Sequence, residues 1–586
     1  MFNIKQTLED LISAAISQVA GVEARALVNP SSRPEFGDYQ ANGVMAVAKQ
    51  MKKNPRELAT AVVAALPAVA LVDRVEIAGP GFINIFLNDA WLAGNADQFA
   101  TAPGQLLGQT HSAQKIVVDY SGPNLAKEMH VGHLRGTIIG DCLVRVLEAV
   151  GHDVVRQNHV GDWGTQFGML IAHMESLRTE SLGEQNGSVD AEVSVQLSDL
   201  ESFYRQAKTR FDQEPGFADL ARSYVVKLQA GDEACLAAWQ LFITESLRHC
   251  EDIYALLGVT LKPSDLKPES FYNNVLADIV NALDEAGLLT VSEGARCVFL
   301  DEFKGKEGTP IPAIVQKSDG GYLYATTDLA ALRYRGQTLQ ADRILYVVDA
   351  RQSLHFQQVF SIARKAGFVA EQCSLEHIAY GTMMGKDGRP FKTRSGDTVK
   401  LKELLDESVR RAADIVSDKN PSLDAQQREE IASVVGISAV KYADLSKNRT
   451  SDYVFDWSTM LSFEGNTAPY MLYAYARIKS MLRKQQGEAE IALAPIRISE
   501  KEERELVIKI LQCPETINLV VAECYPNHLC SYLYELAGIF MRFYEACPVL
   551  RAEAEVRDSR LALLTLTAAT LKQGLELLGL ETLEQM

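Results

Sequence analysis

The order of hydrophobic and polar positions predicts one strand, loop and helix unit close to residue 120. Residues 116–118 form a short apolar run, Ile-Val-Val, that ends at Asp119. Turn-forming residues fill positions 121–124, and apolar residues then recur at helical spacing between Leu134 and Leu147. A second apolar segment begins at Val154. This order predicts a βαβ unit, in which a crossover helix joins two parallel strands.

Further apolar runs before residue 400 are of the kind that parallel sheets bury. We expect the second half of the fold to resume at Ile311, with strands at Ile344–Val348 and Ile378–Met384. The stretch Gly321–Asp328 is expected to lead from a strand into a helix. Between the two halves, the pattern from Met169 to about Asp301 is mainly helical, and we interpret it as an insertion.

The two ends of the chain differ from this central part. The amino-terminal part shows a helical apolar stripe from Leu8 to Val19 and a strand pair over Val75–Leu87, and the pattern beyond Val399 is helical to the end. The predicted fold class is a multidomain α/β protein. Its predicted domains are residues 1–112 (small α/β domain), 113–395 (Rossmann-type parallel sheet with the mainly helical insertion at about 170–300), 396–462 (connecting helices) and 463–586 (all-α domain).

Composition narrows the class of protein. Apolar residues make up 47% and charged residues 23% of the 586 residues, as is typical of globular proteins. The net charge of −18 argues against nucleic-acid binding through bulk charge, so an RNA contact needs local basic surfaces. Nine cysteines without a CxxC pair favour a reduced, cytoplasmic protein. No signal peptide is evident, and Pro67 interrupts the longest apolar run, Ala59–Val72, which is too short to span a membrane.

Two histidines lie at the amino end of the predicted crossover helix. His130 and His133 are three residues apart, so they share one helical face, and Gly132 between them lacks a Cβ that would keep a nucleotide base away. Unpaired N–H groups and the helix dipole favour phosphate here, and histidine donors can stabilise charge during its transfer. Ordinary hydrogen-bonded histidines and half of a metal site are the alternative interpretations. Cys and carboxylate residues are missing at ligand spacing, so we expect no metal ligands from protein side chains.

Other polar residues follow the predicted strands. Ligands of open α/β sheets bind at the carboxyl ends of strands, so we expect these residues to share one crevice with the histidines. They are Asp119, Asn124, Tyr324, Asp328, Gln352 and His355.

The motif His-Val-Gly-His at 130–133 resembles the HIGH signature of class I aminoacyl-tRNA synthetases. The flanking segments DYSGPNLAKEM (119–129) and HVGDWGTQFG (159–168) are similar to the arginyl-tRNA synthetases of bacterial type. The resemblance implies ATP-dependent ligation of L-arginine to tRNA(Arg) through an arginyl-adenylate. It also implies Mg²⁺ bound with ATP, a need for bound tRNA during activation, and a cytoplasmic monomer that has no membrane partner.

The resemblance implies a role for each candidate residue. The catalytic residues would be His130, His133, Lys127 and Lys392, and the ATP-binding residues would be His130, Gly132, His133, His355 and Lys392. Arginine would be bound by Asp119, Ser121, Asn124, His133, Tyr324, Asp328 and Gln352. Asp328 and Tyr324 would hold the guanidinium, whereas Ser121, Asn124 and Gln352 would hold the α-amino and α-carboxylate groups. Some family members carry Glu where this chain has Asp119, and a structural role for Asp119 is the alternative.

The KMSKS loop of class I enzymes is degenerate in this chain. Residues 391–394, Phe-Lys-Thr-Arg, stand in its place, and Lys127 stands where a lysine just before HIGH is thought to compensate in many family members. Lys386–Arg389 can equally be interpreted as a polar β-turn.

Two candidate tRNA surfaces lie outside the central part. By resemblance, Phe82 and Asn84 would contact the D-loop, and Tyr470, Tyr473 and Arg477 would contact the anticodon. The alternatives are a core phenylalanine beside a turn-capping asparagine, and a tyrosine stripe that belongs to the core. Two rival functions remain at this stage: an RNA-binding protein without catalysis, and a nucleotidyltransferase that acts on a small molecule.

Overall fold

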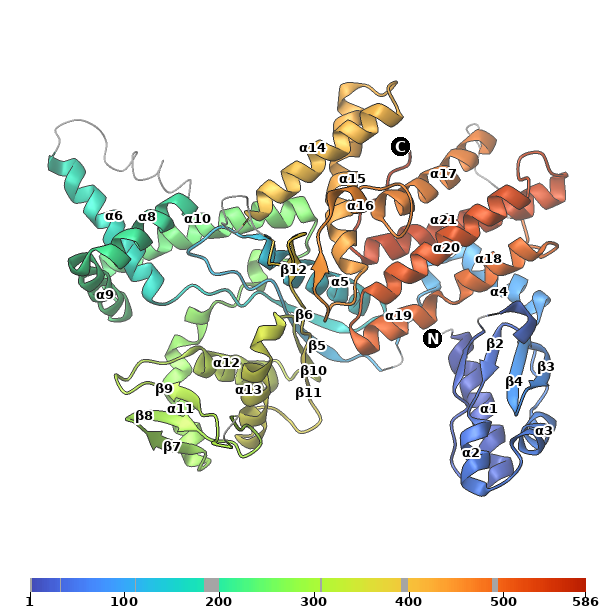
Figure 1. Cartoon of the computed structure of the whole chain (residues 1–586), viewed down its shortest axis with the longest axis horizontal. Helices are drawn as coiled ribbons and strands as arrows, with labels where there is room; N and C mark the ends of the chain where they lie inside the picture. The colour runs from blue at the N-terminus through green and yellow to red at the C-terminus, as the bar shows by residue number, and fades with distance from the viewer. Residues whose placement is uncertain are drawn as a thin grey trace.

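The computed structural model describes residues 3–31, 33–110, 112–183, 200–305, 308–391, 399–486 and 494–586. A four-stranded parallel sheet lies at its centre, in the order β11-β10-β5-β6 (Figure 1). The strands are β5 (Lys115–Asp119), β6 (Asp153–Gln157), β10 (Arg343–Tyr346) and β11 (Ser374–His377). Ile116, Val117 and Val118 are fully buried, as expected for a parallel strand covered on both faces. The predicted βαβ unit is confirmed, with α5 (Leu134–Ala149) as its crossover helix.

The register of this sheet brings four strand ends into one row. Asp119 is paired with Gln157 on one side and with Tyr346 on the other, and Tyr346 is paired with His377. The helices α12 (Tyr324–Arg333) and α13 (Ser353–Lys365) belong to the second half of the same domain. The loops after β5 and β10 therefore lead into α5 and α13 at one edge of the sheet, as the sequence predicts, and α12 contacts the start of α13 through Asp328 and His355.

The insertion is mainly helical, as predicted, and it ends in a small antiparallel sheet that the sequence pattern does not indicate. Its helices are α6 (Thr165–Gly183), α8 (Leu200–Gln213), α9 (Pro215–Gln229), α10 (Glu233–Leu257) and α11 (Leu276–Glu285). They are followed by an antiparallel sheet of β7 (Leu289–Ser292), β8 (Ala295–Val298) and β9 (Ala313–Gln316). Glu293 and Gly294 both have positive φ, at 52° and 81°, and form the two-residue turn between β7 and β8. A short hairpin of this type carries too little periodicity to be separated from helix by pattern.

A correction concerns the predicted strand over Ile378–Met384. The central strand β11 already ends at His377, and only β12 (Met383–Met384) is extended, where it pairs with β13 (Tyr453–Val454). Gly381 lies so close to Ser451 and Asp452 that a Cβ there would come within 2.7 Å of both. The chain therefore leaves the sheet to pack against a later segment, and β13 interrupts the helices expected beyond Val399.

The remaining segments form the two terminal parts. The amino-terminal part has the sheet β1-β2-β4-β3, and its strand pair over Val75–Leu87 is confirmed. Its elements are α1 (Ile4–Ala20), β1 (Val28–Pro30), β2 (Tyr39–Ala41), α2 (Val44–Met51), α3 (Pro55–Ala65), β3 (Val72–Ala78), β4 (Phe82–Leu87) and α4 (Asp89–Thr101). The later helices are α14 (Leu401–Lys419), α15 (Ala425–Leu445), α16 (Trp457–Met460), α17 (Ala468–Gln486), α18 (Lys501–Leu511), α19 (Cys513–Glu523), α20 (Asn527–Ala546) and α21 (Ala554–Leu577).

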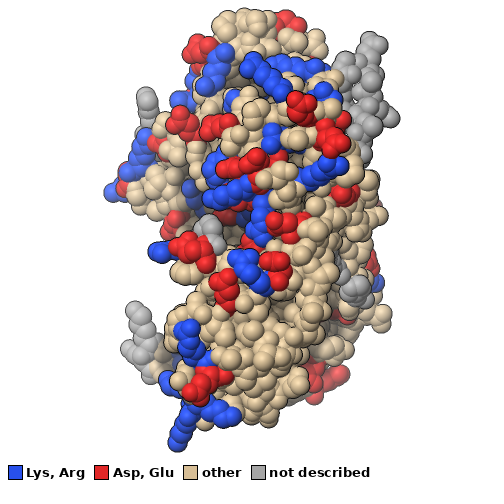
Figure 2. Space-filling view, turned by 90° about the vertical axis from the view of Figure 1, so that its right-hand side faces the viewer, with Lys and Arg blue, Asp and Glu red and all other residues tan. Residues whose placement is uncertain are grey.

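The amino-terminal part packs against the carboxyl-terminal helices (Figure 1). Arg504 on α18 forms ion pairs with Asp38 at 2.7 Å and with Asp89 at 2.6 Å, and the Tyr39 hydroxyl donates to Glu515 on α19 at 2.7 Å. Basic and acidic side chains are mixed on the face that carries these two parts (Figure 2). Within the described residues, every helix falls short of the length and apolarity that a membrane span requires.

Candidate active site

The histidine pair lies at the amino end of α5, where the sequence predicts it. His130 precedes a 3-10 turn, Val131–His133, that continues into α5. Nδ1 of His130 accepts the N–H of Gly132 at 3.0 Å, and Nδ1 of His133 accepts the N–H of His130 at 3.1 Å. The two ring centroids are 4.0 Å apart. The backbone therefore fixes both rings side by side at the positive end of the helix.

Both rings are held in the neutral form. Because each Nδ1 accepts a hydrogen bond, the ring proton is assigned to Nε2, which becomes a donor. Burial, with a smaller contribution from the His130 ring, lowers the pKa of His133 to about 3. Burial also lowers the pKa of His130, and the nearby charges of Lys127 and Arg351 lower it further. Two uncharged N–H donors are thus available for a phosphate group at neutral pH.

Gly132 is required by the histidine pair itself. A Cβ at this position would lie 2.7 Å from Cε1 of the His130 ring, so a side chain there would displace the ring. Glycine at position 132 therefore leaves room for the His130 ring, in addition to the access for a nucleotide base that the sequence predicts. Beside the pair, the ammonium of Lys127 lies 4.2 Å from the ring centroid of Tyr204 on α8, a cation–π contact that limits where the lysine points.

A second group of polar residues surrounds Asp328 on α12. Its carboxylate is 2.6 Å from Nε2 of His355 on α13 and 3.9 Å from Nε2 of His159. The exposed Tyr324 ring stands edge-on to His355, with centroids 4.8 Å apart. Burial raises the pKa of Glu269 to about 7, and the charge of Asp328 contributes to the rise. The predicted neighbours Tyr324, Asp328 and His355 therefore lie together, in an acidic environment.

Asp119 belongs to a buried ion pair. Its carboxylate accepts from Nη2 of Arg335 at 2.8 Å, and Nε of the same guanidinium donates to Gln157 at 2.6 Å. Arg335 is fully buried and lies in a π-helical turn directly after α12. Asp119 thus joins the row of strand ends to α12, which supports the structural alternative for this residue. A contact between Asp119 and arginine stays a prediction.

Several buried polar atoms near this row have no hydrogen-bond partner among the described residues. They are Nη1 of Arg335, Nε2 of Gln157, and the hydroxyls of Tyr272 and Tyr346. Burial raises the pKa of both tyrosine hydroxyls, and the nearby charges of Asp119 and Asp328 also raise it. Buried polar atoms normally have partners, so this cluster marks a place for a polar ligand or ordered water.

Three further candidates lie on the loops beside the strand ends. Ser121 has a positive φ of 72°, and its hydroxyl lies 2.9 Å from that of Thr137 on α5. Asn124 is exposed and pairs with Gly161 in a short parallel bridge, where a Cβ at Gly161 would collide with the asparagine oxygen. Gln352 is exposed, one residue from Arg351, whose charge acts on His130. The described residues contain no group of three His, Cys, Asp or Glu side chains arranged to hold a metal ion.

Three family models match successive parts of the chain. Residues 6–87 match the arginyl tRNA synthetase N terminal domain, residues 99–457 match the catalytic domain of class I (R) tRNA synthetases, and residues 471–586 match the DALR anticodon binding domain. The chain is 56% identical to the arginine–tRNA ligase of Marinomonas sp. and 55% identical to that of Hahella chejuensis, in both cases over 100% of each chain. The chain belongs to the arginyl-tRNA synthetase family.

Solved structures of arginyl-tRNA synthetases have the same fold. The Plasmodium falciparum structure gives a TM-score of 0.85 at 29% identity over 100% of each chain. The Thermus thermophilus structure gives a TM-score of 0.81 at 26% identity, and covers 99% of this chain and 100% of that one. The family, the fold class and the arginine–tRNA ligase activity predicted from the sequence are confirmed. Both rival functions are therefore set aside.

Among the synthetase's candidate tRNA contacts, Asn84 is buried, whereas the prediction of a tRNA contact implies an exposed side chain. Asn84 is 2% exposed, and its side-chain oxygen accepts from Nε2 of Gln40 at 2.7 Å. Phe82, two residues earlier on β4, is partly exposed beside the Gly79 turn. Asn84 is therefore a buried residue inside β4, paired with Gln40, and not the turn-capping asparagine of the alternative interpretation. A contact of Phe82 and Asn84 with tRNA stays a prediction.

The candidate tRNA-binding residues on α17 form two groups with different neighbours. Arg477 donates to the Tyr473 hydroxyl at 2.9 Å and lies 4.3 Å from the ring centroid of Tyr544, and Tyr473 and Arg477 line a surface hollow of about 570 Å³. Tyr470 instead packs edge-on against Tyr534, with centroids 5.8 Å apart. The helix thus presents Tyr473 and Arg477 toward a hollow that can receive a base, whereas Tyr470 is half-buried. Their roles in tRNA binding stay predictions.

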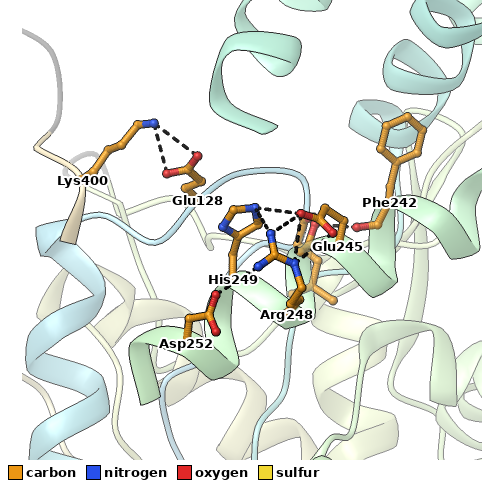
Figure 3. A network of polar contacts seen from close by, with 9 residues as sticks. Glu128, Phe242, Glu245, Arg248, His249, Asp252 and Lys400 are labelled. Atoms are coloured by element: carbon orange, nitrogen blue, oxygen red, sulfur yellow. Dashed lines mark hydrogen bonds and ion pairs between the residues drawn. The ribbon is translucent and has the colours of Figure 1, made fainter. Parts of the chain in front are cut away.

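Lys392, in the degenerate KMSKS-like loop, lies outside the described residues. The segment that follows the loop is fixed to the histidine motif: the N–H of Val131 donates to Val399, and the N–H of Leu401 donates to Met129. The ammonium of Lys400 faces the carboxylate of Glu128 at 3.2 Å, beside α10 (Figure 3). Before the loop, residues 385–388 form the β-turn suggested by the sequence.

Sequence analysis missed four residues of the site: His159, Tyr204, Glu269 and Arg335. His159 lies inside a quoted motif, so the motif itself could have indicated it. The other three come from helical or irregular segments after β6, and nothing in their local pattern separates them from ordinary core or surface residues. Each is recognised only from its contact across the fold.

Proposed function

We propose that ATP and L-arginine bind side by side between the histidine pair and Asp328, where they are joined as arginyl-adenylate. The arginine carboxylate attacks the α-phosphate of ATP, and pyrophosphate leaves. The arginyl group then passes from AMP to the terminal ribose of tRNA(Arg). The observation that carries this proposal is that Asp328, His355 and the histidine-bearing start of α5 all lie at the carboxyl edge of one parallel sheet.

The guanidinium of arginine is assigned to Asp328 and Tyr324. A carboxylate has two oxygens that can accept a bidentate pair from guanidinium, and the Asp328 oxygens face His355 and His159, with 14% of the side chain exposed. Tyr324 supplies an exposed ring as a flat wall, and Glu269 adds negative charge when ionised. Ser121, Asn124 and Gln352 are left to bind the α-amino and α-carboxylate groups. A neutral amino acid would leave the acidic groups without partners, which explains selectivity.

The phosphates of ATP are assigned to His130, His133 and Lys127. The two Nε2–H groups donate to the phosphate oxygens on which charge develops, while the α5 amino terminus and the Lys127 ammonium add positive potential. Lys392 and His355 complete the predicted ATP contacts. Mg²⁺ would enter with the triphosphate and neutralise part of its charge, which fits the lack of a three-ligand cluster among the described side chains. The enzyme supplies position and charge and needs no nucleophile of its own.

The outer parts of the chain are assigned to tRNA. Residues 1–112 would bind the tRNA elbow and residues 463–586 the anticodon, with the sheet domain at 113–395 and the helices at 396–462 between them. We expect a cytoplasmic monomer in which bound tRNA is needed for activation. The acidic net charge and the mixed charges of Figure 2 indicate that RNA binding relies on local contacts.

Arginine-dependent exchange between ATP and pyrophosphate, measured with and without tRNA(Arg), tests the proposal. We expect exchange with arginine and tRNA together, and none with lysine in place of arginine. The Glu429→Gln variant, which changes an exposed side chain on α15, is the matched control and should behave as wild type. Absence of exchange with all substrates present would contradict the activity, and equal exchange without tRNA would contradict the tRNA requirement.

A further inference from the structure

The long helix α10 of the insertion contacts three loops of the active site. The indole N–H of Trp239 donates to the carbonyl of Asp162 at 2.7 Å, the Ser246 hydroxyl donates to the carbonyl of Leu125, and the Tyr254 hydroxyl is 2.7 Å from that of Ser121. The three α10 residues are separated by seven and eight positions, so they lie on one face of the helix. Figure 3 shows the neighbouring face, where Glu245, Arg248 and His249 contact one another near Glu128.

The contact at Tyr254 is part of a chain of hydrogen bonds. At one end, Oδ1 of Asn158 accepts the N–H of Gly122 at 3.0 Å, so its Nδ2 is the group that donates to Tyr254 at 3.0 Å. At the other end, the Thr137 hydroxyl faces two acceptors, the carbonyl of His133 at 2.8 Å and the Ser121 hydroxyl at 2.9 Å.

The hydroxyl of Ser121 is therefore oriented from both sides. Its oxygen lies 2.7 Å from the Tyr254 hydroxyl and 2.9 Å from the Thr137 hydroxyl. A hydroxyl can take part in three hydrogen bonds, through one proton and two lone pairs, so Ser121 keeps one further position for a ligand. The backbone of Ser121 has φ of 72°, a conformation that is costly for a residue with a Cβ and persists only when its surroundings hold it.

We propose that Tyr254 is a positioning residue for arginine, through which the helical insertion holds Ser121 in the conformation that binds the substrate α-amino or α-carboxylate group. This inference rests on the proposed role of Ser121 and extends it to a residue 133 positions away in the chain. Tyr254 and Asn158 are 7% and 5% exposed, so water cannot take the place of the tyrosine hydroxyl without rearrangement. The insertion thereby acquires a specific task in amino-acid binding.

The Tyr254→Phe variant tests the proposal because it removes only the hydroxyl. We expect the KM for arginine to rise about tenfold, since one buried donor and one buried acceptor lose their partner. The KM for ATP should change less than twofold, because the ATP contacts come from the histidine pair. Tyr532→Phe is the matched control: Tyr532 is also buried on a long helix, and its hydroxyl donates to Lys509 at 3.0 Å, far along the chain from the site.

A double-mutant cycle with Ser121→Ala separates positioning from general loss of stability. In the Ser121→Ala background, Tyr254→Phe should have no further effect on the KM for arginine. The proposal is overturned if Tyr254→Phe leaves that KM unchanged, if the two effects multiply, or if Tyr532→Phe raises it equally. Failure of the proposed function is separate, because wild-type enzyme would then form no arginyl-tRNA. Thermal melting of the three single variants shows whether each is folded.

Discussion

Arginine binding is expected to remove a proton from Glu269. Burial is the main cause that raises the pKa of this carboxyl from 4.5 to about 7; the charges of Asp328 and Asp162 contribute to the rise, and His159 opposes it. In the proposed complex a guanidinium lies against Asp328, and its positive charge favours the ionised form of Glu269. Free enzyme therefore holds a proton near pH 7 that the complex releases, and arginine should bind more weakly as the pH falls.

The size of the effect follows from the pKa. With a pKa of about 7, roughly nine-tenths of Glu269 is protonated at pH 6 and roughly one-tenth at pH 8, so the apparent Kd for arginine should be about tenfold higher at pH 6, or about 1.4 kcal/mol. The pH dependence of folding stability has the opposite sign to that of arginine binding. A raised folded-state pKa means that the stability linked to Glu269 is fully present below pH 4.5 and is lost as the pH rises through 7. Glu269→Gln should therefore raise Tm at pH 8 and leave it unchanged at pH 4.

Isothermal titration with arginine at pH 6, 7 and 8 measures this coupling. Each titration is repeated in two buffers of different ionisation enthalpy, which gives the number of protons released. We expect release approaching one proton at pH 6 for wild type and for the Glu429→Gln control, and a pH-independent Kd for Glu269→Gln. The reasoning is refuted if the wild-type Kd is the same at pH 6 and pH 8, or if Glu269→Gln keeps the full pH dependence.

Three more perturbations test other contacts of the site. Asp328→Ala should weaken arginine binding by about 3 kcal/mol, since the guanidinium loses its charged partner, and wild-type affinity by titration would rule out this pocket. His133→Ala should lower the rate of adenylate formation in pyrophosphate exchange and leave the arginine Kd nearly unchanged. Because the pKa of His133 is lowered to about 3, this residue should add no acid limb to the pH profile of wild-type kcat between pH 5 and 8. An unchanged turnover number in the variant would exclude His133 from the mechanism. Arg335→Ala should destabilise the fold by about 3–5 kcal/mol in urea melts, because Asp119 then stays buried without its partner, and a wild-type midpoint would contradict the importance of this pair.

The part of the site that follows strands could be predicted from the sequence. A buried parallel strand is recognised as a continuous apolar run, and the polar residues after several such runs must meet at one edge. His355 satisfies this rule because it follows β10, whereas Asp328 follows β9 of the separate antiparallel sheet and comes within 2.6 Å of His355 through the packing of α12 beside α13. Asp119 also lies at the end of a buried strand, but the rule could not show that its carboxylate would pair with Arg335. Position at the edge is set by topology, whereas the pairing of charges is set by packing.

The contribution of the insertion could not be predicted for the same physical reason. Helical periodicity shows that α10 has a buried face, but it does not show which loop that face will meet. Trp239, Ser246 and Tyr254 would serve equally well as core residues, and each becomes a site residue only because its polar atom meets a loop that follows β5 or β6. Ser121, on one of these loops, has an unfavourable backbone conformation. A segment inserted between the halves of the sheet domain therefore supplies the order that the strand ends alone do not provide.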